Sequence, residues 1–222
     1  MRFTGFFPRG MIFLENLRDN NQREWFLEHK TEYLDFIYEP MKALVTELTP
    51  TMEGIDAGFV TEPHRVVSRI YRDTRFSKNK LPYRTAVWMS FHRRTADWKD
   101  SPVFYLEISL TGYRYGMGFY QAIPATMMKF RAFVDRYPDD FLNAISFFSP
   151  KFYLVDGEFY KKPFVNPHPK SVQPYYQAKT FYLSHEAQHD ALLFSRKLVS
   201  TLQKNFERLK PLYDFIWRMK NN

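Results

Sequence analysis

Hydrophobic residues recur at helical spacing in the N-terminal quarter of the chain. Residues 11–19 carry apolar side chains three and four positions apart, which predicts a helix. Asn21 followed by Glu24 matches a capping box, so we expect a second helix to begin there and to continue through 25–48. Pro40 falls inside that stretch and is expected to kink or restart the helix.

Helical spacing returns in the second half of the chain. Residues 124–148 predict a helix, and a C-terminal apolar stripe begins at Phe194 and ends at Met219. Pro211 lies within that stripe and predicts a break in it. The intervening residues 151–176 are rich in proline and lysine, and they predict two short strands around a turn followed by a long surface loop.

Between these regions the pattern changes to short runs of β-branched and aromatic residues, which predict an antiparallel sheet. We therefore expect an α+β fold, with one domain over residues 1–222 and a mostly antiparallel central sheet covered by N-terminal and C-terminal helices. The predicted strands are 66–71, 85–93, 103–110 and 113–120.

The last two runs predict a hairpin. If Thr111 and Gly112 make a two-residue turn, the residues that face each other on one side are all apolar or aromatic, which supports this register. The other side is polar and carries Glu107 and Arg114. There the register pairs Ser109 with Arg114, Glu107 with Gly116 and Tyr105 with Gly118.

The two glycines leave side-chain gaps on this polar side. Glycine inside a strand weakens it, and one reason to find it there is the close approach of a ligand or of another backbone. A helix packed across Gly116 and Gly118 explains them equally well, so both explanations stay open. Glu107 is the acid–base candidate of this side.

The composition is that of a globular protein with many aromatic residues. Of 222 residues, 45% are hydrophobic, 25% are charged and 19% are aromatic. The absence of cysteine excludes disulfides, thiolate nucleophiles and cysteine-based zinc sites. No uncharged span approaches membrane length, and charged residues and Pro8 interrupt the N-terminal apolar run. We therefore expect a cytoplasmic protein with no membrane partner.

The net charge of +8 is unevenly distributed along the chain. Residues 1–60 carry a charge of −4, whereas residues 61–100 and 151–222 each carry +6. Basic regions of this kind attract phosphate, nucleic acid or an anionic surface. The alternative is that the acidic N-terminal helices dock on the basic middle of the chain and cancel much of its charge.

The sequence HEAQH at 185–189 has the spacing of a zinc-binding helix, with Glu186 as general base. However, Ser184 is a natural N-cap that places His185 at the first helical position, so we prefer a solvated helix start. We assign no metal site, and the cofactor is unknown. The chain has neither a Walker-type phosphate loop nor a G-x-S-x-G nucleophile elbow.

The strongest candidate site is the basic stretch RIYRDTRFSKNK, which begins at residue 69. A strand ending near residue 71 and a loop over 73–82 would gather its cations at one sheet edge. Asp73 would orient one guanidinium while another stays free, and Tyr83 would supply a hydroxyl. An ion-pair network tying the loop to the acidic helices fits these residues equally well. The residues assigned are Arg69, Arg72, Asp73, Arg75, Lys80 and Tyr83, with Glu107 and Arg114 from the hairpin.

The basic stretch matches R-x-x-R-D-x-R-F-x-x-[DN]-K-x-x-Y without departure, and by this motif the chain resembles a bacterial "domain of unknown function" family. FLENLRDNNQREWFLEHKTEY and PVFYLEISLTGYRYGMGFY resemble the same family, so the resemblance covers most of the chain. It implies a bacterial, cytoplasmic, stand-alone protein, and it carries over no activity, substrate or catalytic residue. HEAQH is not part of the family's pattern.

Three functions fit the sequence. The first is a pocket, enzymatic or not, for a phosphorylated or other anionic small ligand, in which Arg72, Arg75 and Lys80 bind the anion, Asp73 orients an arginine and Glu107 exchanges protons. The second is a nucleic-acid-binding module, in which the basic loop and the lysines of 151–176 follow phosphates while exposed Tyr or Phe side chains stack on bases. The third is a protein-interaction or scaffold domain without a small-molecule site.

Overall fold

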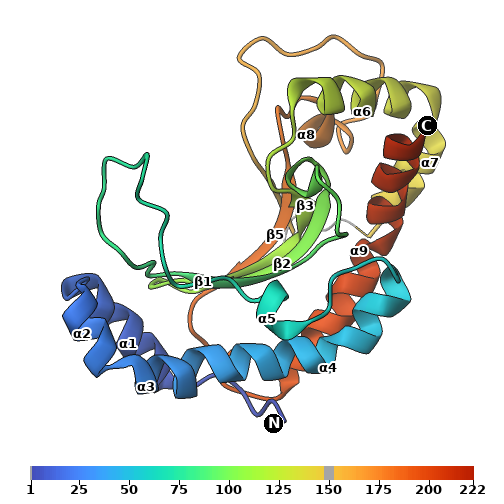
Figure 1. Ribbon diagram of the computed structural model, residues 1–222. Helices are drawn as coiled ribbons and strands as arrows, with labels where there is room; N and C mark the ends of the chain where they lie inside the picture. Colours follow the sequence, from blue (N-terminus) through green and yellow to red (C-terminus); the bar gives the residue numbers. More distant parts are fainter. Residues whose placement is uncertain (1, 148–152) are drawn as a thin grey trace. The chain divides into compact units, whose positions relative to one another are not determined.

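The computed structural model describes residues 2–147 and 153–222 (Figure 1). Both helices and strands are present, so the predicted α+β class is confirmed. The contacts cluster in two compact units, and the single domain over residues 1–222 stays a prediction. Unit 1 comprises Met1–Phe91, Tyr105–Arg114 and Glu186–Gln203, and unit 2 comprises His92–Phe104, Tyr115–His185 and Lys204–Asn222.

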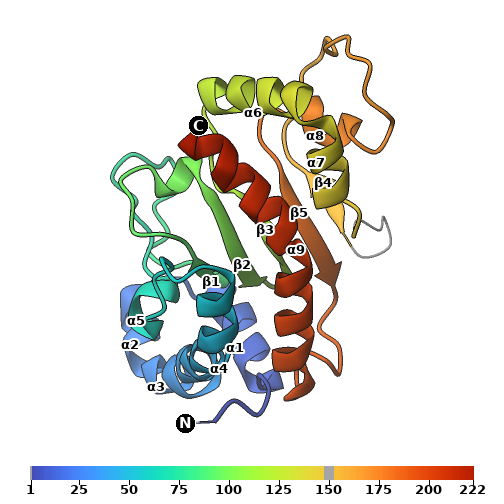
Figure 2. The same ribbon diagram turned by 90° about the vertical axis from the view of Figure 1, so that its right-hand side faces the viewer.

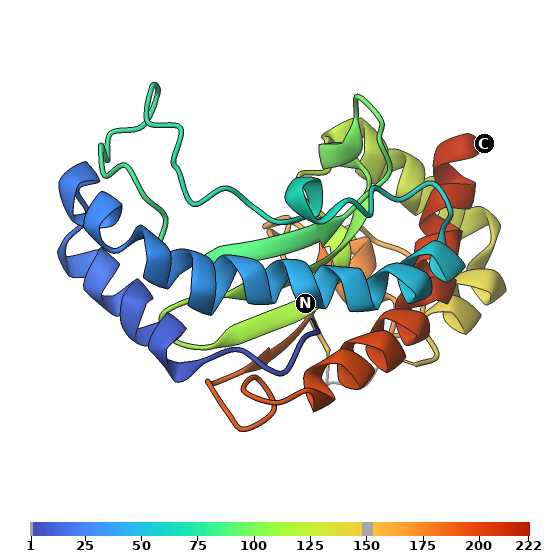
Figure 3. The same cartoon turned by 60° about the horizontal axis from the view of Figure 1, so that its bottom comes forward.

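Unit 1 begins with the predicted N-terminal helices, which Figure 3 shows in blue. Their apolar residues are buried at helical spacing, as the sequence pattern requires, and α4 packs against the first strand of the sheet. The helices are α1 (Pro8–Asp19), α2 (Arg23–Glu28), α3 (Lys30–Tyr33), α4 (Glu39–Ile55) and α5 (Pro63–Val66).

The helix restarts near Pro40, as predicted, and it does so by changing from a π-helical turn to an α-helix. A turn of π-helix, η1 (Leu34–Tyr38), precedes α4, and Pro40 lies in the first turn of α4. Proline has no N–H to donate and its ring crowds the carbonyl four residues earlier, so an α-helical ladder cannot pass through it unchanged. A wider π-turn is one way to accommodate such an interruption.

The predicted capping box is wrong. Helix α2 begins at Arg23 with Gln22 at the N-cap position, and within the described residues no side chain caps it. Asn21 is buried and its amide is bonded instead to the main chain of Tyr83. The side chain of Asn21 therefore does not cap the helix, because it binds a residue 62 positions away in the sequence.

The sheet has the strand order β1-β2-β3-β5-β4 and is mostly antiparallel, as predicted. Residues 66–71 do not form the predicted strand, because they contain part of α5 and make only the single bridges Val67 to Met89 and Tyr71 to Tyr83. The strands are β1 (Val87–Phe91), β2 (Pro102–Ile108), β3 (Tyr113–Phe119), β4 (Leu154–Asp156) and β5 (Tyr182–Ala187).

The hairpin between β2 and β3 has the predicted faces but a different register. The main-chain N–H of Ser109 donates to the carbonyl of Gly112 (2.9 Å), so the central turn residues are Leu110 and Thr111. The predicted turn at Thr111 and Gly112 is therefore wrong. A shift of two residues leaves every side chain on its predicted face, which is why the apolar pattern could not distinguish the registers.

Unit 2 contains the middle helices and most of the C-terminal helix (Figure 2). The predicted break at Pro211 is wrong, because α9 passes through it, and the buried apolar residues on both sides of Pro211 stabilise the continuous helix. Phe148, the end of the predicted helix over 124–148, lies outside the described residues. The helices are η2 (Trp98–Asp100), α6 (Pro124–Arg136), α7 (Pro138–Ala144), α8 (Gln173–Tyr176) and α9 (Lys197–Asn221).

Among the described residues, no helix is both long enough and apolar enough to cross a membrane.

Candidate functional site

The basic motif forms a projecting loop that we call the arm, residues 69–84, shown in teal in Figure 1. Two short antiparallel segments make its base: the N–H of Arg72 donates to the carbonyl of Pro82 (2.8 Å), and the N–H of Arg84 donates to that of Ile70 (2.8 Å). Between them the chain has no regular structure. The predicted loop after residue 71 is thus present, next to β1.

Asp73 orients Arg75, as expected. Its Oδ1 accepts from Arg75 Nε (2.9 Å) and its Oδ2 from Arg75 Nη2 (2.7 Å), while the Arg75 N–H also donates to Oδ1. These hydrogen bonds, first that of the guanidinium and then that of the main chain, lower the pKa of Asp73 to about 2. The carboxylate is therefore ionised at neutral pH, which suits an orienting role.

The other cations of the arm mostly face solvent. Arg69, Lys78 and Lys80 are exposed, and Lys80 Nζ donates to the carbonyl of Thr74 (3.0 Å). The alternative network of ion pairs to the acidic helices is not seen: throughout residues 2–147 and 153–222, the arm's only ion pair is the one within the arm between Asp73 and Arg75. The arm therefore keeps a large excess of positive charge.

Phe76 is the most unusual residue of the arm. Its side chain is 94% exposed, and the guanidinium carbon of Arg75 lies 5.8 Å from the centre of its ring. The sequence predicted exposed aromatic residues without identifying this one. The sequence does contain an indication that Phe76 is exposed. Its neighbours are polar and charged, and it belongs to no apolar periodicity that would place it in a core.

Tyr83 is a buried residue at the base of the arm rather than one on its surface. It is buried, and its ring stacks on Phe26 with centroids 4.2 Å apart. Burial, with smaller effects from Tyr71 and charged neighbours, raises the pKa of its hydroxyl. The predicted role of that hydroxyl toward a ligand stays a prediction, since the ring itself is part of the packing that supports the arm.

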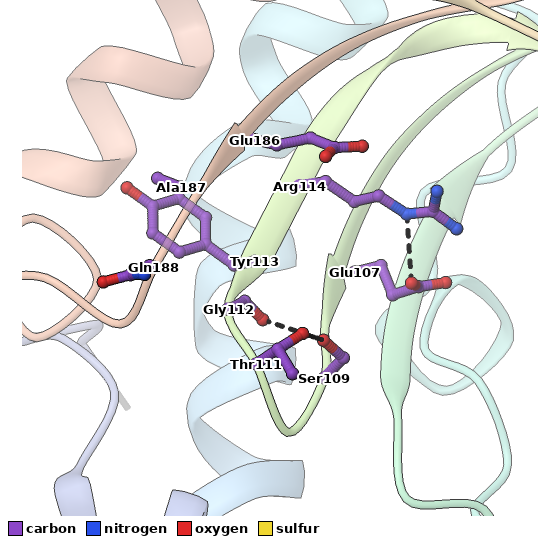
Figure 4. A pocket seen from close by; sticks show the side chains of 9 residues that line it. All are labelled: Glu107, Ser109, Thr111, Gly112, Tyr113, Arg114, Glu186, Ala187 and Gln188. Atoms are coloured by element: carbon purple, nitrogen blue, oxygen red, sulfur yellow. Dashed lines mark hydrogen bonds and ion pairs between the residues drawn. The ribbon is translucent and has the colours of Figure 1, made fainter.

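The two hairpin candidates lie together in a separate hollow of unit 1, with a volume of about 450 Å³ (Figure 4). Arg114 Nε donates to Glu107 Oε1 (3.0 Å), and both side chains are about two-thirds buried. In Figure 4 the carboxylate of Glu186 lies on the same side as Arg114, while Tyr113 points the other way. The shifted register explains the pair, because it places Glu107 opposite Arg114 rather than opposite Gly116.

The structure thus divides the predicted site residues into two groups. Six belong to the arm or its base, and two to the hollow. In the described part of the chain, no hydrogen bond or ion pair joins an arm residue to Glu107. The hollow is a polar surface of mixed charge, and the excess of positive charge lies on the arm.

The glycines of β3 face another backbone, which is one of the expected explanations. A Cβ on Gly116 would collide with the carbonyl of Leu183, and one on Gly118 would collide with the Cα of Tyr182, both in β5. Neither a ligand nor a helix is needed to explain them.

The expected helix start at HEAQH is wrong, because Tyr182–Ala187 forms β5. A strand alternates its side chains, so this segment does not present His185 and His189 one helical turn apart. His189 instead places Nε2 at 2.9 Å from the carbonyl oxygen of Ser109. Within the described residues, no group of three or more His, Asp or Glu side chains is placed to hold a metal ion.

Comparison with known proteins identifies a family. The family described as conserved hypothetical protein (DUF2461) matches residues 9–215, which is most of the chain and includes the arm. No curated protein matches the chain.

Proposed function

The chain belongs to the family of conserved hypothetical proteins (DUF2461), and from its own geometry we propose that it binds single-stranded nucleic acid through the arm. The observation that carries the proposal is the exposure of Phe76 in a loop with six cations and one carboxylate. Proteins that bind single strands combine positive charge along the backbone with aromatic rings on which bases stack.

The exposed ring of Phe76 supports this function because the folded protein gains little from it. A phenylalanine that is 94% exposed contributes almost no burial energy. Stacking of one base on an aromatic side chain is worth about 1–3 kcal/mol. The ring is therefore better suited to a partner than to the protein's own core.

The neighbouring charges support phosphate binding beside that ring. Asp73 holds the guanidinium of Arg75 close to Phe76, so an aromatic surface and a cationic group occur side by side. Within the described residues Arg75 Nη1 has no hydrogen-bond partner, and Arg69 and Lys78 have none for their side chains. These groups can follow the phosphates of a flexible strand.

The exposure of the arm favours an extended polyanion over an enclosed small ligand. Stacking on Phe76 requires bases that are not already stacked in a duplex, so an unpaired strand fits better than double-stranded DNA. The anionic small ligand predicted from the sequence stays a prediction. Glu107 has no role in the proposed binding.

The test is a fluorescence anisotropy titration of labelled oligothymidine and oligouridine of roughly 16 nucleotides, repeated over a range of salt concentrations. Each phosphate contact to a single strand contributes about −0.7 to the slope of log K against log salt. The double substitution Arg69→Ala, Lys78→Ala is expected to make this slope less steep by about 1 to 1.5. Affinity that does not change with salt contradicts the proposal.

The matched control removes two exposed cations of α9, in Lys204→Ala, Arg208→Ala. It changes the net charge equally but leaves the arm intact, so its slope is expected to stay at the wild-type value. If the slope of log K against log salt becomes less steep by the same amount in both double variants, binding depends on the net charge and the arm is not the site. If polyglutamate displaces the labelled oligonucleotide as well as an unlabelled oligonucleotide does, the result points instead to an acidic protein partner.

A further inference from the structure

Unit 2 contains a buried arginine, Arg131 of α6, with an incomplete set of partners. Only 6% of this residue is exposed. Its Nη1 donates to the carbonyl oxygens of Tyr176 (3.2 Å) and Ala178 (3.1 Å). Its Nη2 is buried and has no hydrogen-bond partner among the described residues. A buried donor of a charged group that lacks a partner costs more than a neutral one, and it calls for an explanation.

Among the described residues, no carboxylate forms an ion pair with this guanidinium. Asp135 is four residues further along the same helix, the usual spacing for an ion pair with Arg131. Its carboxylate instead accepts from Tyr176 (3.0 Å) and lies 2.7 Å from Nε2 of His168. In the part of the chain that the structure describes, Arg131 forms no ion pair. A buried guanidinium without a counter-charge is costly unless something else supplies the negative charge.

Two aromatic rings, in edge-to-face contact with centroids 5.1 Å apart, pack together against one side of the guanidinium. Its carbon lies 4.4 Å from the ring centre of Phe164 and 5.4 Å from that of Tyr160. The main chain of Phe164 is held by Gln177, which accepts from its N–H (2.8 Å) and donates to its carbonyl (2.9 Å). Phe164 is 41% exposed, so the ring that packs on the guanidinium carbon lies partly at the surface.

The surroundings add further positive charge. Lys179 Nζ lies 5.9 Å from the ring centre of Tyr160, although it also pairs with Glu158 (3.3 Å). Lys161 and Lys162 are exposed in the same loop. An anion that reaches Arg131 therefore meets a locally basic entrance.

We infer that Arg131 is the anchor of a binding site for a small ligand that carries an oxyanion, either a carboxylate or a phosphate. The planar guanidinium presents Nη2 to the anion while Nη1 stays on its two carbonyl partners. Tyr160 and Phe164, which contact each other edge to face, form a single aromatic surface against which the rest of the ligand packs. This site is separate from the arm and does not depend on the proposed nucleic-acid binding.

The experiment measures the midpoint of thermal unfolding, Tm, with sodium phosphate or sodium acetate as probe and sodium chloride at matched ionic strength as reference. Phosphate raises Tm of most proteins by exclusion from the surface, so the readout is the difference between wild type and Arg131→Met. We expect at least one probe to raise the wild-type Tm by at least twice as much as that of the variant.

A second variant covers the case in which Arg131→Met does not fold. Phe164→Ala keeps the hydrogen bonds of Arg131 and removes a ring that packs on its guanidinium, so the probe-induced rise in Tm is expected to exceed that of wild type at the same probe concentration. The arm variant Phe76→Ala is expected to show the same probe-induced rise in Tm as wild type. Equal rises in wild type and in whichever of Arg131→Met and Phe164→Ala fold overturn the inference and make Arg131 a purely structural residue.

Discussion

The side-chain amide of Asn21 bonds both main-chain groups of Tyr83: Nδ2 donates to its carbonyl (3.1 Å) and Oδ1 accepts from its N–H (3.0 Å). Asn21 is 7% exposed, so water cannot readily replace these bonds. The amide therefore satisfies both main-chain hydrogen-bonding groups of one residue at the base of the arm, as a residue of a neighbouring strand would. It connects the segment between α1 and α2 to the second base segment of the arm.

Asn21→Ala is expected to lower the free energy of unfolding by about 2–4 kcal/mol, because it leaves two buried main-chain groups of Tyr83 without partners. Urea unfolding measures the change. Asn20→Ala is the control, since its exposed amide donates to the carbonyl of Asn16 within the same helix end, and a change within about 0.5 kcal/mol is expected. Equal effects of the two substitutions would show that the Asn21 contact contributes little.

Tyr83→Phe is expected to leave both stability and oligonucleotide affinity close to wild type. The ring stacks on Phe26, and this contact does not need the hydroxyl. Urea unfolding should change by no more than about 0.5 kcal/mol. A large loss of affinity in this variant would instead support the ligand role that the sequence predicted for the hydroxyl.

Glu47 predicts a pH-dependent stability. Burial acts to raise its pKa, but hydrogen bonds from Arg196 and from the N–H of Phe3 outweigh it and lower the pKa below the usual 4.5. A lowered carboxyl pKa contributes stability that is full above pH 4.5 and is lost as the pH falls through the folded-state value.

Wild type is therefore expected to exceed Glu47→Gln in stability at pH 7, and the gap is expected to narrow below pH 4.5. Urea unfolding at a series of pH values measures both. Glu28→Gln, which changes an exposed carboxylate of α2, should show no such gap. A gap that is constant with pH would mean that Glu47 acts through its shape and not through its charge.

Two glycine substitutions are expected to have opposite effects. Gly116→Ala places a Cβ against the carbonyl of Leu183, and because that atom belongs to a paired strand it cannot move aside cheaply. Thermal unfolding should show a Tm well below wild type. In Gly54→Ala, within α4, the new Cβ has no described atom within 4 Å, and the substitution is expected to stabilise the protein by about 0.5–1 kcal/mol through helix propensity. A tolerated Gly116→Ala would contradict the close approach of β5.

Much of this fold follows from local periodicity. The N-terminal helices, β1 and the faces of the hairpin were predicted because burial repeats every 3.6 or every two residues. The hairpin register was not, because registers two residues apart bury the same face. The strand β5 was missed because Ser184 and HEAQH look like a helix start when only nearby residues are considered.

The candidate site was less predictable than the fold. The link from Asp73 to Arg75 spans two positions and could be read from the sequence. Asn21 and Tyr83, like Arg131 and Phe164, are joined by contacts between residues far apart in the chain. Local patterns contain no information about such contacts, so the support beneath the arm and the buried arginine became visible only in three dimensions.

The measurement that tests the central claim most directly is the affinity of Phe76→Ala for oligothymidine, by anisotropy at one fixed salt concentration. Loss of a stacked base predicts affinity weaker by about fivefold to a hundredfold or more, equivalent to about 1–3 kcal/mol. Tyr120→Ala, which removes another exposed aromatic ring, in unit 2, should bind as wild type does. Wild-type affinity in Phe76→Ala would contradict the account.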